Sequence, residues 1–447
     1  MRIPMVRTNG CHGWRNVFLL VLCLLPSHAT SLMAQSTGPS GPNPYGRLIR
    51  EIRIEGLRIT RESAARDQLA SQVGHLYTEE TAQDDLRWLD RLGVFSSIQA
   101  KPVVIQDEVI LTIEVQELPR ILPYPSANIS DESGFSIGIG ARIPSLLQRA
   151  IAFSGSTRFG GGSETEVSTH TPWKLRRREW FGAKYNYRNR ANKMDSFREN
   201  SHELEVRIGI GLRQNWRLSG RFGFMSLGSD TSGITLSSDN RDNTPALGAV
   251  LEYDGRDLPS NPHSGWETIF DISQSGGFLG GDGDFVTTQF DIRRYQPLAA
   301  RHVLAFFSYA TFQTGSVGET VPVYRDYKIG GKNSVRGWKK GARRGNNQFL
   351  NTLEYRFELF RPRSFRIHSF GFYAGLQLVA FGDLGTAWDQ GSEFTGNMIA
   401  AGGFGLHVLV PFVERIRIEF GFGQSGAGML SHFGVREKAN YSRRRVR

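Results

Sequence analysis

From about residue 119 onward, apolar and polar residues alternate in short runs. Clear examples are residues 135–143 (FSIGIGARI), 204–212 (LEVRIGIGL), 353–359 (LEYRFEL) and 416–422 (IRIEFGF). One face of each run is aliphatic or aromatic, and the other face carries Arg, Glu, Gly or Ser. A period of two predicts β-strands, and the Gly, Asn, Asp and Ser residues between the runs predict turns. The sequence therefore predicts a chain that is mainly β.

The repeated charged face favours a transmembrane antiparallel β-barrel over a soluble β-sandwich. A sandwich needs short strands around a shared dry core, whereas a barrel alternates lipid-facing apolar residues with polar residues that face a wet lumen. The mature sequence contains no apolar stretch of 18 residues, so helical membrane spans are not expected. At roughly 20 residues for each strand with its connection, residues 119–447 accommodate about 16 strands.

Residues 48–118 have a different pattern, which predicts a small α/β domain. The elements follow in the order strand, helix, helix, strand, strand. Ile52, Ile54 and Leu57 mark the first strand, and the later elements occupy residues 61–71, 78–93, 97–104 and 108–115. Thr60 and Thr78 stand where helix N-caps are expected, and Gly93 is placed to end the second helix. Such a β-α-α-β-β unit leaves edges of its sheet exposed.

The first 34 residues resemble a secretory signal peptide. Arginines open the segment, residues 17–25 form a short apolar core, and Pro26 follows it. Nine apolar residues are too few to span a bilayer as a helix, which argues against the alternative of a membrane anchor. Cleavage is expected after Ala29 or Ala34. Residues 35–47 then form a linker rich in Ser, Pro and Gly.

Charge and cysteine content narrow the function classes. The chain carries 54 Lys and Arg against 43 Asp and Glu, a net charge of +11, but the basic residues are scattered among glycines and aromatics. No recognition-helix pattern or dense basic arm is visible, so we expect no nucleic-acid partner; acidic lipid headgroups fit the charge equally well. Both cysteines, Cys11 and Cys23, lie in the presequence, so the mature chain has no disulfide or thiol nucleophile.

Enzyme signatures are weak. Residues 421–426 spell G-x-G-x-x-G, but this motif lies in or just after a predicted strand rather than before a helix. Ser425 lacks the glycine two residues later that a nucleophile elbow requires. The histidines form no H-x-x-x-H pair. We therefore predict no catalytic residue, no cofactor and no metal site.

Five segments carry recognisable motifs. Residues 86–95 read LRWLDRLGVF, residues 381–388 read FGDLGTAW, and residues 402–411 with 416–422 form a hairpin pattern. The pattern D-x-R-D…P-x-x-G is carried by Asp254, Arg256, Asp257, Pro262 and Gly265. A loop motif V-R-G-W with two preceding glycines is carried by Gly330, Gly331, Val335, Arg336, Gly337 and Trp338. Taken in chain order, these segments resemble motifs of the BamA/TamA superfamily, which includes the bacterial surface antigen family: its POTRA signature, its D-x-R-D…P-x-x-G hairpin, its V-R-G-[FY] loop (here with Trp in place of Phe or Tyr), its F-x-D-x-G strand and its penultimate hairpin.

The resemblance implies one periplasmic POTRA-like domain, residues 48–118, followed by an outer-membrane barrel of about 16 strands, residues 119–447. In the family the motif arginine folds into the lumen and docks on acids, and Glu354 and Asp383 are the matching acids here. Strand parity alone also places Glu354 and Asp383 on the face opposite the apolar residues. The alternative is that Arg336 is only one of several loop cations.

The implied function is the insertion or translocation of polypeptides at the bacterial outer membrane. Expected partners are unfolded outer-membrane or secreted polypeptides, outer-membrane lipids and periplasmic accessory proteins. A client strand would add to the sheet edge near residues 108–115, and the seam would join residues 135–143 to residues 427–435. Two departures weaken a housekeeping role: only one POTRA-like unit is present, and the chain continues beyond Phe433. A dedicated secretion channel of the two-partner type and a structural surface-antigen barrel remain as alternatives.

Overall fold

The computed structural model describes residues 42–130, 134–172, 175, 179–259, 261–367, 370–389, 391–392, 394, 398–409, 413–423 and 429–437. The predicted signal peptide, most of the linker, both cysteines and Ser425 lie outside these residues. Within them, no helix is both long and apolar enough to cross a membrane.

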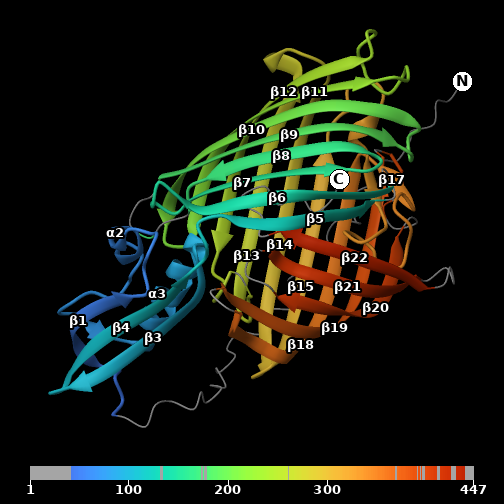
Figure 1. The fold of residues 1–447 in the computed structure, drawn as a ribbon. Helices are drawn as coiled ribbons and strands as arrows, with labels where there is room; N and C mark the ends of the chain where they lie inside the picture. The colour runs from blue at the N-terminus through green and yellow to red at the C-terminus, as the bar shows by residue number, and fades with distance from the viewer. Residues whose placement is uncertain are drawn as a thin grey trace, which may run out of the picture. The chain divides into compact units, whose positions relative to one another are not determined.

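A four-stranded sheet with two helices forms the N-terminal part of the described chain (Figure 1). Its strand order is β2-β1-β4-β3, in which β1 runs parallel to β4 and β3 antiparallel to it. The elements are β1 (Arg47–Glu55), α2 (Glu62–Arg66), β2 (Leu76–Tyr77), α3 (Glu79–Leu92), β3 (Phe95–Ile105) and β4 (Glu108–Glu117). Alternate residues of β4 are buried and form one core with Leu89 and Leu92 of α3. The β-α-α-β-β order is confirmed, with the short strand β2 added between the helices.

The second helix forms as the sequence predicts. Thr78 is its N-cap and exchanges hydrogen bonds with Thr81: Thr78 Oγ1 accepts from the Thr81 backbone N–H at 3.1 Å, and Thr81 Oγ1 accepts from the Thr78 N–H at 3.0 Å. Gly93 ends the helix in the left-handed conformation, with φ of 64°. This pairing satisfies N–H groups that a helix start otherwise leaves unpaired.

The first helix is shorter than predicted, and Thr60 does not cap it. The N-cap residue is Arg61, which makes no side-chain cap hydrogen bond, and the helix ends at Arg66. The physical reason for the early end lies in α3. The buried Asp85 carboxylate accepts the backbone N–H groups of Ala70 at 2.6 Å and Ser71 at 3.0 Å, so these groups are not available to a continuing helix.

Glu117, the last residue of β4, holds the chain that leads into α2. Its carboxylate accepts the N–H groups of Arg58 and Ile59 at 2.6 Å and of Thr60 at 2.7 Å. We expect Glu117→Ala to destabilise this sheet by about 2 kcal/mol, because three donors lose a charged acceptor at a partly exposed site. Hydrogen-exchange protection of the β1 and β4 amides measures the loss.

Glu114→Ala is the matched control for this prediction. Glu114 lies on the same strand, and its one side-chain partner among the described residues is Lys101, in an exposed ion pair. Its removal should cost less than about 0.5 kcal/mol. Equal losses in the two variants would contradict the proposed role of Glu117.

All other long strands belong to one antiparallel sheet of 16 strands (Figure 1). The strands are β5 (Leu122–Ser130), β6 (Gly134–Leu146), β7 (Ile151–Phe159), β8 (Gly162–His170), β9 (Glu179–Asn192), β10 (Phe197–Arg213), β11 (Trp216–Ser229), β12 (Arg241–Asp254), β13 (Gly265–Gly276), β14 (Asp284–Ala299), β15 (His302–Gln313), β18 (Asn347–Ile367), β19 (Phe370–Trp388), β20 (Ile399–Leu409), β21 (Val413–Gly423) and β22 (Met429–Glu437). The short helix η1 (Gly277–Leu279) connects β13 to β14. Each strand pairs with its neighbours in sequence, except that β15 pairs with β18. The sheet curls until β5 and β22 come into contact.

The two faces of this sheet differ as the sequence predicts. On β18, Leu353 and Tyr355 are 48 % and 38 % exposed, whereas Glu354 between them is 5 % exposed. The inner face is held by ion pairs, such as Arg207 with Glu205 at 2.9 Å and Arg221 with Asp271 at 2.9 Å. An apolar exterior around a charged interior is the pattern of a transmembrane barrel.

Two predicted edges are wrong. The barrel sheet begins at β5, so residues 135–143 lie in the second strand. Residues 122–130 were not predicted as a strand; they contain Pro123 and Pro125, and an end strand tolerates proline because one side of it needs no hydrogen bonds. In the smaller sheet, β4 lies between β1 and β3, so residues 108–115 form no edge.

Candidate functional site

The candidate site is the long connection between β15 and β18, residues 314–346. It contains a short helix, η2 (Val323–Arg325), and a two-stranded ribbon of β16 (Tyr327–Ile329) and β17 (Arg343–Gly345). The turn between the ribbon strands carries the V-R-G-W motif. Gly330 has a φ of 114°, and a Cβ there would lie 2.0 Å from the Lys339 carbonyl oxygen. Gly331 N–H donates to the Trp338 carbonyl at 2.7 Å, so the turn closes at its base.

Arg336 is buried at the tip of this turn, 3 % exposed. Its Nε and Nη2 donate to the two oxygens of Asp383 at 2.7 and 2.8 Å, and its backbone N–H adds a third bond at 3.0 Å. Its Nη1 donates to Glu354 at 3.1 Å. The guanidinium also lies 3.5 Å from the ring centroid of Phe381. The two acids implied by the resemblance therefore both contact Arg336.

A third acid, Glu419, completes the cluster, and it was missed from the sequence. Arg336 Nη1 donates to Glu419 Oε1 at 2.7 Å. Glu419 shares the strand parity of Arg417 and Gly421, opposite the apolar residues of β21, and this parity is the signal that could have placed it in the lumen. The three acids come from β18, β19 and β21. Burial alone would lower the pKa of Arg336, but its bonds to Asp383, Glu354 and Glu419 raise it above the ordinary value.

The other motif residues pack the turn against the wall. Val335 is fully buried in an apolar cluster, and Trp338 Nε1 donates to the Ala400 carbonyl at 2.8 Å. The cluster contains Tyr309, Ile329, Val335, Leu350, Ala387 and Ile399. Gly337 has a φ of 94°, and a Cβ there would lie 2.7 Å from the backbone of β21. A Cβ on Gly421 would lie 2.5 Å from Gly337 N. Close backbone contact thus accounts for the first part of the G-x-G-x-x-G pattern; its last three residues lie outside the described chain.

The D-x-R-D…P-x-x-G residues form a second, separate cluster between β12 and β13. Arg256 donates to both Asp254 oxygens at 2.8 and 2.9 Å. Asp257 Oδ1 accepts the His263 N–H at 3.0 Å, and Pro262 is buried. Gly265 has a φ of 102°, and a Cβ there would lie 2.2 Å from the Gly255 oxygen. By strand register this hairpin lies at the end of the barrel opposite the 314–346 connection, so the structure does not bring the two motifs together.

His263 links this hairpin to β18, and this link predicts that the stability of the hairpin depends on pH. His263 Nε2 lies 2.9 Å from Glu358 Oε1. Burial would lower the pKa of His263, but the bond to Glu358 and the charges of Glu358 and Asp257 raise it above its ordinary value of 6.5. The ion pair between His263 and Glu358 therefore stabilises the hairpin fully below pH 6.5, and this stabilisation is lost as pH rises through the raised pKa of His263. We expect protection factors of residues 261–267 to fall across that window, and to stay flat in His263→Gln. An unchanged pH dependence in that variant would contradict the assignment.

No group of three or more His, Cys, Asp or Glu side chains that could hold a metal ion occurs in the part of the chain that the structure describes.

Comparison with known families decides the assignment. Residues 150–428, more than half of the chain, match the Omp85 superfamily domain. The chain belongs to the Omp85 superfamily. Residues 48–118 match the POTRA family, described as a surface antigen variable number repeat. The resemblance to the BamA/TamA superfamily is thereby confirmed.

Individual relatives of this Omp85 chain are distant. The outer membrane protein assembly factor BamA of Nitratidesulfovibrio vulgaris is 23% identical over 372 residues, which cover 77% of this chain and 44% of that protein. BamA from Haemophilus ducreyi lacking POTRA domains 1–3 has a similar fold, with a TM-score of 0.55 and 15% identity over 87% of this chain and 83% of that one. CdiB from Escherichia coli gives a TM-score of 0.57 and 13% identity over 88% and 75%.

Proposed function

We propose that this protein inserts polypeptides into the bacterial outer membrane, or moves them across it, with its POTRA-like domain in the periplasm. The observation that carries the proposal is the contact between β5 and β22. Among the described residues, these two strands meet without a ladder of backbone hydrogen bonds, although every other neighbouring pair in the sheet has one. Unpaired strand edges are templates for an incoming strand, so this seam can open towards the membrane and accept a client.

The POTRA-like domain offers a second edge, at β3 rather than at β4. Within the described part of the chain, β3 pairs with β4 and with no other strand, and β2 at the other edge has two residues. Exposed apolar side chains occur on β3, with Val103 52 % and Ile105 43 % exposed. An extended client segment can add to β3 through backbone hydrogen bonds before it reaches the seam.

In this proposal the V-R-G-W turn fills the lumen and prevents leakage. Its support is the burial of Arg336 among three carboxylates from three strands. Outer-membrane lipids and periplasmic accessory proteins are the further partners that the mechanism requires. The relative from Nitratidesulfovibrio vulgaris, named as an assembly factor, agrees with this function.

The second candidate is a channel that secretes one dedicated polypeptide through the lumen. The fold likeness to CdiB from Escherichia coli, at a TM-score of 0.57, is the observation that favours it. In that case the turn must leave the lumen during transport, whereas assembly at the seam lets it stay.

The test uses the purified mature chain in liposomes, with insertion of an unfolded model barrel and ion conductance measured side by side. Faster insertion at low conductance supports assembly at the seam. No acceleration, with conductance that rises steeply in Arg336→Ala, supports the secretion channel. If the chain neither accelerates insertion nor conducts ions, and if deletion of its gene leaves the envelope composition unchanged, the protein is a structural surface barrel.

A further inference from the structure

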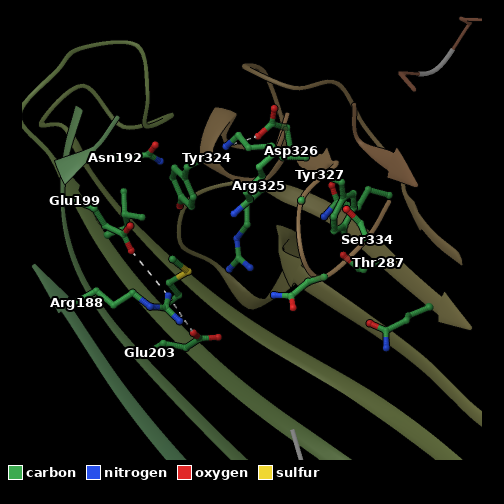
Figure 2. A pocket seen from close by; sticks show the side chains of 18 of the residues that line it. Arg188, Asn192, Glu199, Glu203, Thr287, Tyr324, Arg325, Asp326, Tyr327 and Ser334 are labelled. Atoms are coloured by element: carbon green, nitrogen blue, oxygen red, sulfur yellow. Dashed lines mark ion pairs between the residues drawn. The ribbon is translucent and has the colours of Figure 1, made fainter. Parts of the chain in front are cut away.

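A cavity of about 930 Å³ lies inside the barrel between the 314–346 connection and a wall formed mainly by β7 to β15, with residues of β21 and β22 at its margin. Figure 2 shows the wall residues Arg188, Glu199 and Glu203 on one side. Tyr324, Arg325 and Tyr327 of the connection lie on the other side. Pockets of this size hold small-molecule ligands. The Arg336 cluster is a different site, since Arg336, Asp383 and Glu354 do not line this cavity.

The charges of the wall largely satisfy one another. Glu164 pairs with Arg158 at 2.8 Å, Glu199 with Arg190 at 3.1 Å, and Asp271 with Arg221 at 2.9 Å. Each of these acids lies opposite a wall arginine within hydrogen-bond distance. The wall acids therefore do not depend on cations from the connection.

The connection instead adds cations to the cavity. Arg325, Lys332, Lys339 and Lys340 all line it. Asp326, the acidic residue that the connection contributes to the lining, is already bound by Lys328 at 3.0 Å and by Arg344 at 2.6 Å. The excess charge on this side of the cavity is thus positive.

Among these cations, Arg325 has an unsatisfied side-chain donor. Its Nε is buried and has no hydrogen-bond partner among the described residues. Figure 2 shows its side chain extending from the connection into the cavity, with no ion pair drawn to the wall. A guanidinium presents a planar fork of donors that matches phosphate and carboxylate oxygens. A buried donor without an acceptor is costly, and a bound anion removes that cost.

We propose that this cavity binds a small solute that carries phosphate groups, with Arg325 as the fork and Lys339 as a second cation. The tyrosines Tyr324 and Tyr327 lie beside Arg325 in the lining and give the solute an aromatic surface. The inference goes beyond the proposed function, because the binding needs neither a client polypeptide nor an open seam.

The experiment is isothermal titration calorimetry of the full mature chain in detergent micelles, with pyrophosphate as the probe. We expect saturable binding that weakens with salt. Arg325→Gln and Lys339→Gln should each weaken it about 10-fold, as expected for the loss of one charged hydrogen bond. Arg213→Gln is the control: Arg213 is an exposed arginine at the far end of β10, outside the cavity lining, and its loss should change nothing.

Folding and ligand class are controlled in the same series. Each variant is first checked for the heat-dependent gel shift of a folded barrel, and Arg325→Lys keeps the charge but removes the fork, so it should bind with intermediate strength. Unchanged affinity in folded Arg325→Gln, or no binding of pyrophosphate to the wild type, would overturn the proposal. Binding of a hexaglutamate peptide in preference to pyrophosphate would also overturn it, in favour of a polypeptide segment in the cavity.

Discussion

Arg336→Glu is expected to unfold most of the barrel population in detergent, under conditions in which the native barrel stays folded. In the native protein one guanidinium binds Asp383, Glu354 and Glu419, all buried in the lumen. Removing one partner of a buried ion pair costs about 3–5 kcal/mol, because the remaining charge is left buried and unpaired. The alanine variant should lose that amount. The glutamate variant should lose more, since it places a fourth negative charge in the cluster.

The heat-dependent mobility of the barrel on detergent gels measures this loss, together with ion conductance in bilayers. Arg213→Glu is the control, because Arg213 is an exposed arginine of β10 outside the 314–346 connection and the cavity lining. Asp383→Arg should partly rescue Arg336→Glu, since it restores one opposite-charge contact but does not restore the contacts of residue 336 with Glu354 and Glu419. A single Arg336→Glu variant with normal stability and low conductance would refute the central role of this arginine.

A disulfide that joins β5 to β22 is expected to abolish client insertion in the liposome assay, and a reducing agent should restore it. The only cysteines of the full sequence are Cys11 and Cys23, so an introduced pair is unique in the chain after the predicted signal peptide. A covalent bond across the seam stops these strands from separating, whatever the client.

Leu204→Cys with Phe224→Cys is the matched control for the seam. These residues lie directly opposite each other on β10 and β11, which are already joined by a regular ladder. Opposed residues on antiparallel strands have the Cα spacing that a disulfide needs. This second disulfide should leave insertion unchanged. Full activity of the oxidised β5–β22 variant would exclude lateral opening.

Local patterns predicted most of the fold because they act over a few residues. Thr78 and Gly93 fix the ends of α3, and alternation gives the face of Glu354. Contacts between residues far apart in the sequence could not be predicted from such local patterns. The Asp85 carboxylate, which belongs to α3, binds backbone groups just after α2 and so limits its length. The prolines of β5 argue against a strand in the sequence, although β5 forms one at an end of the sheet. Parity could have placed Glu419 in the lumen, but only the folded barrel shows which inward acids reach Arg336.

The V-R-G-W turn is fastened to β21, the neighbour of the final strand. Arg336 binds Glu419 there, and Gly337 crosses Gly421 in direct backbone contact. A hinge movement that swings β21 and β22 outward from β20 must therefore pull the Glu419 carboxylate away from its guanidinium. Opening of the wall in this way and release of the turn are mechanically one event. A smaller movement, which displaces β22 alone, leaves the turn seated.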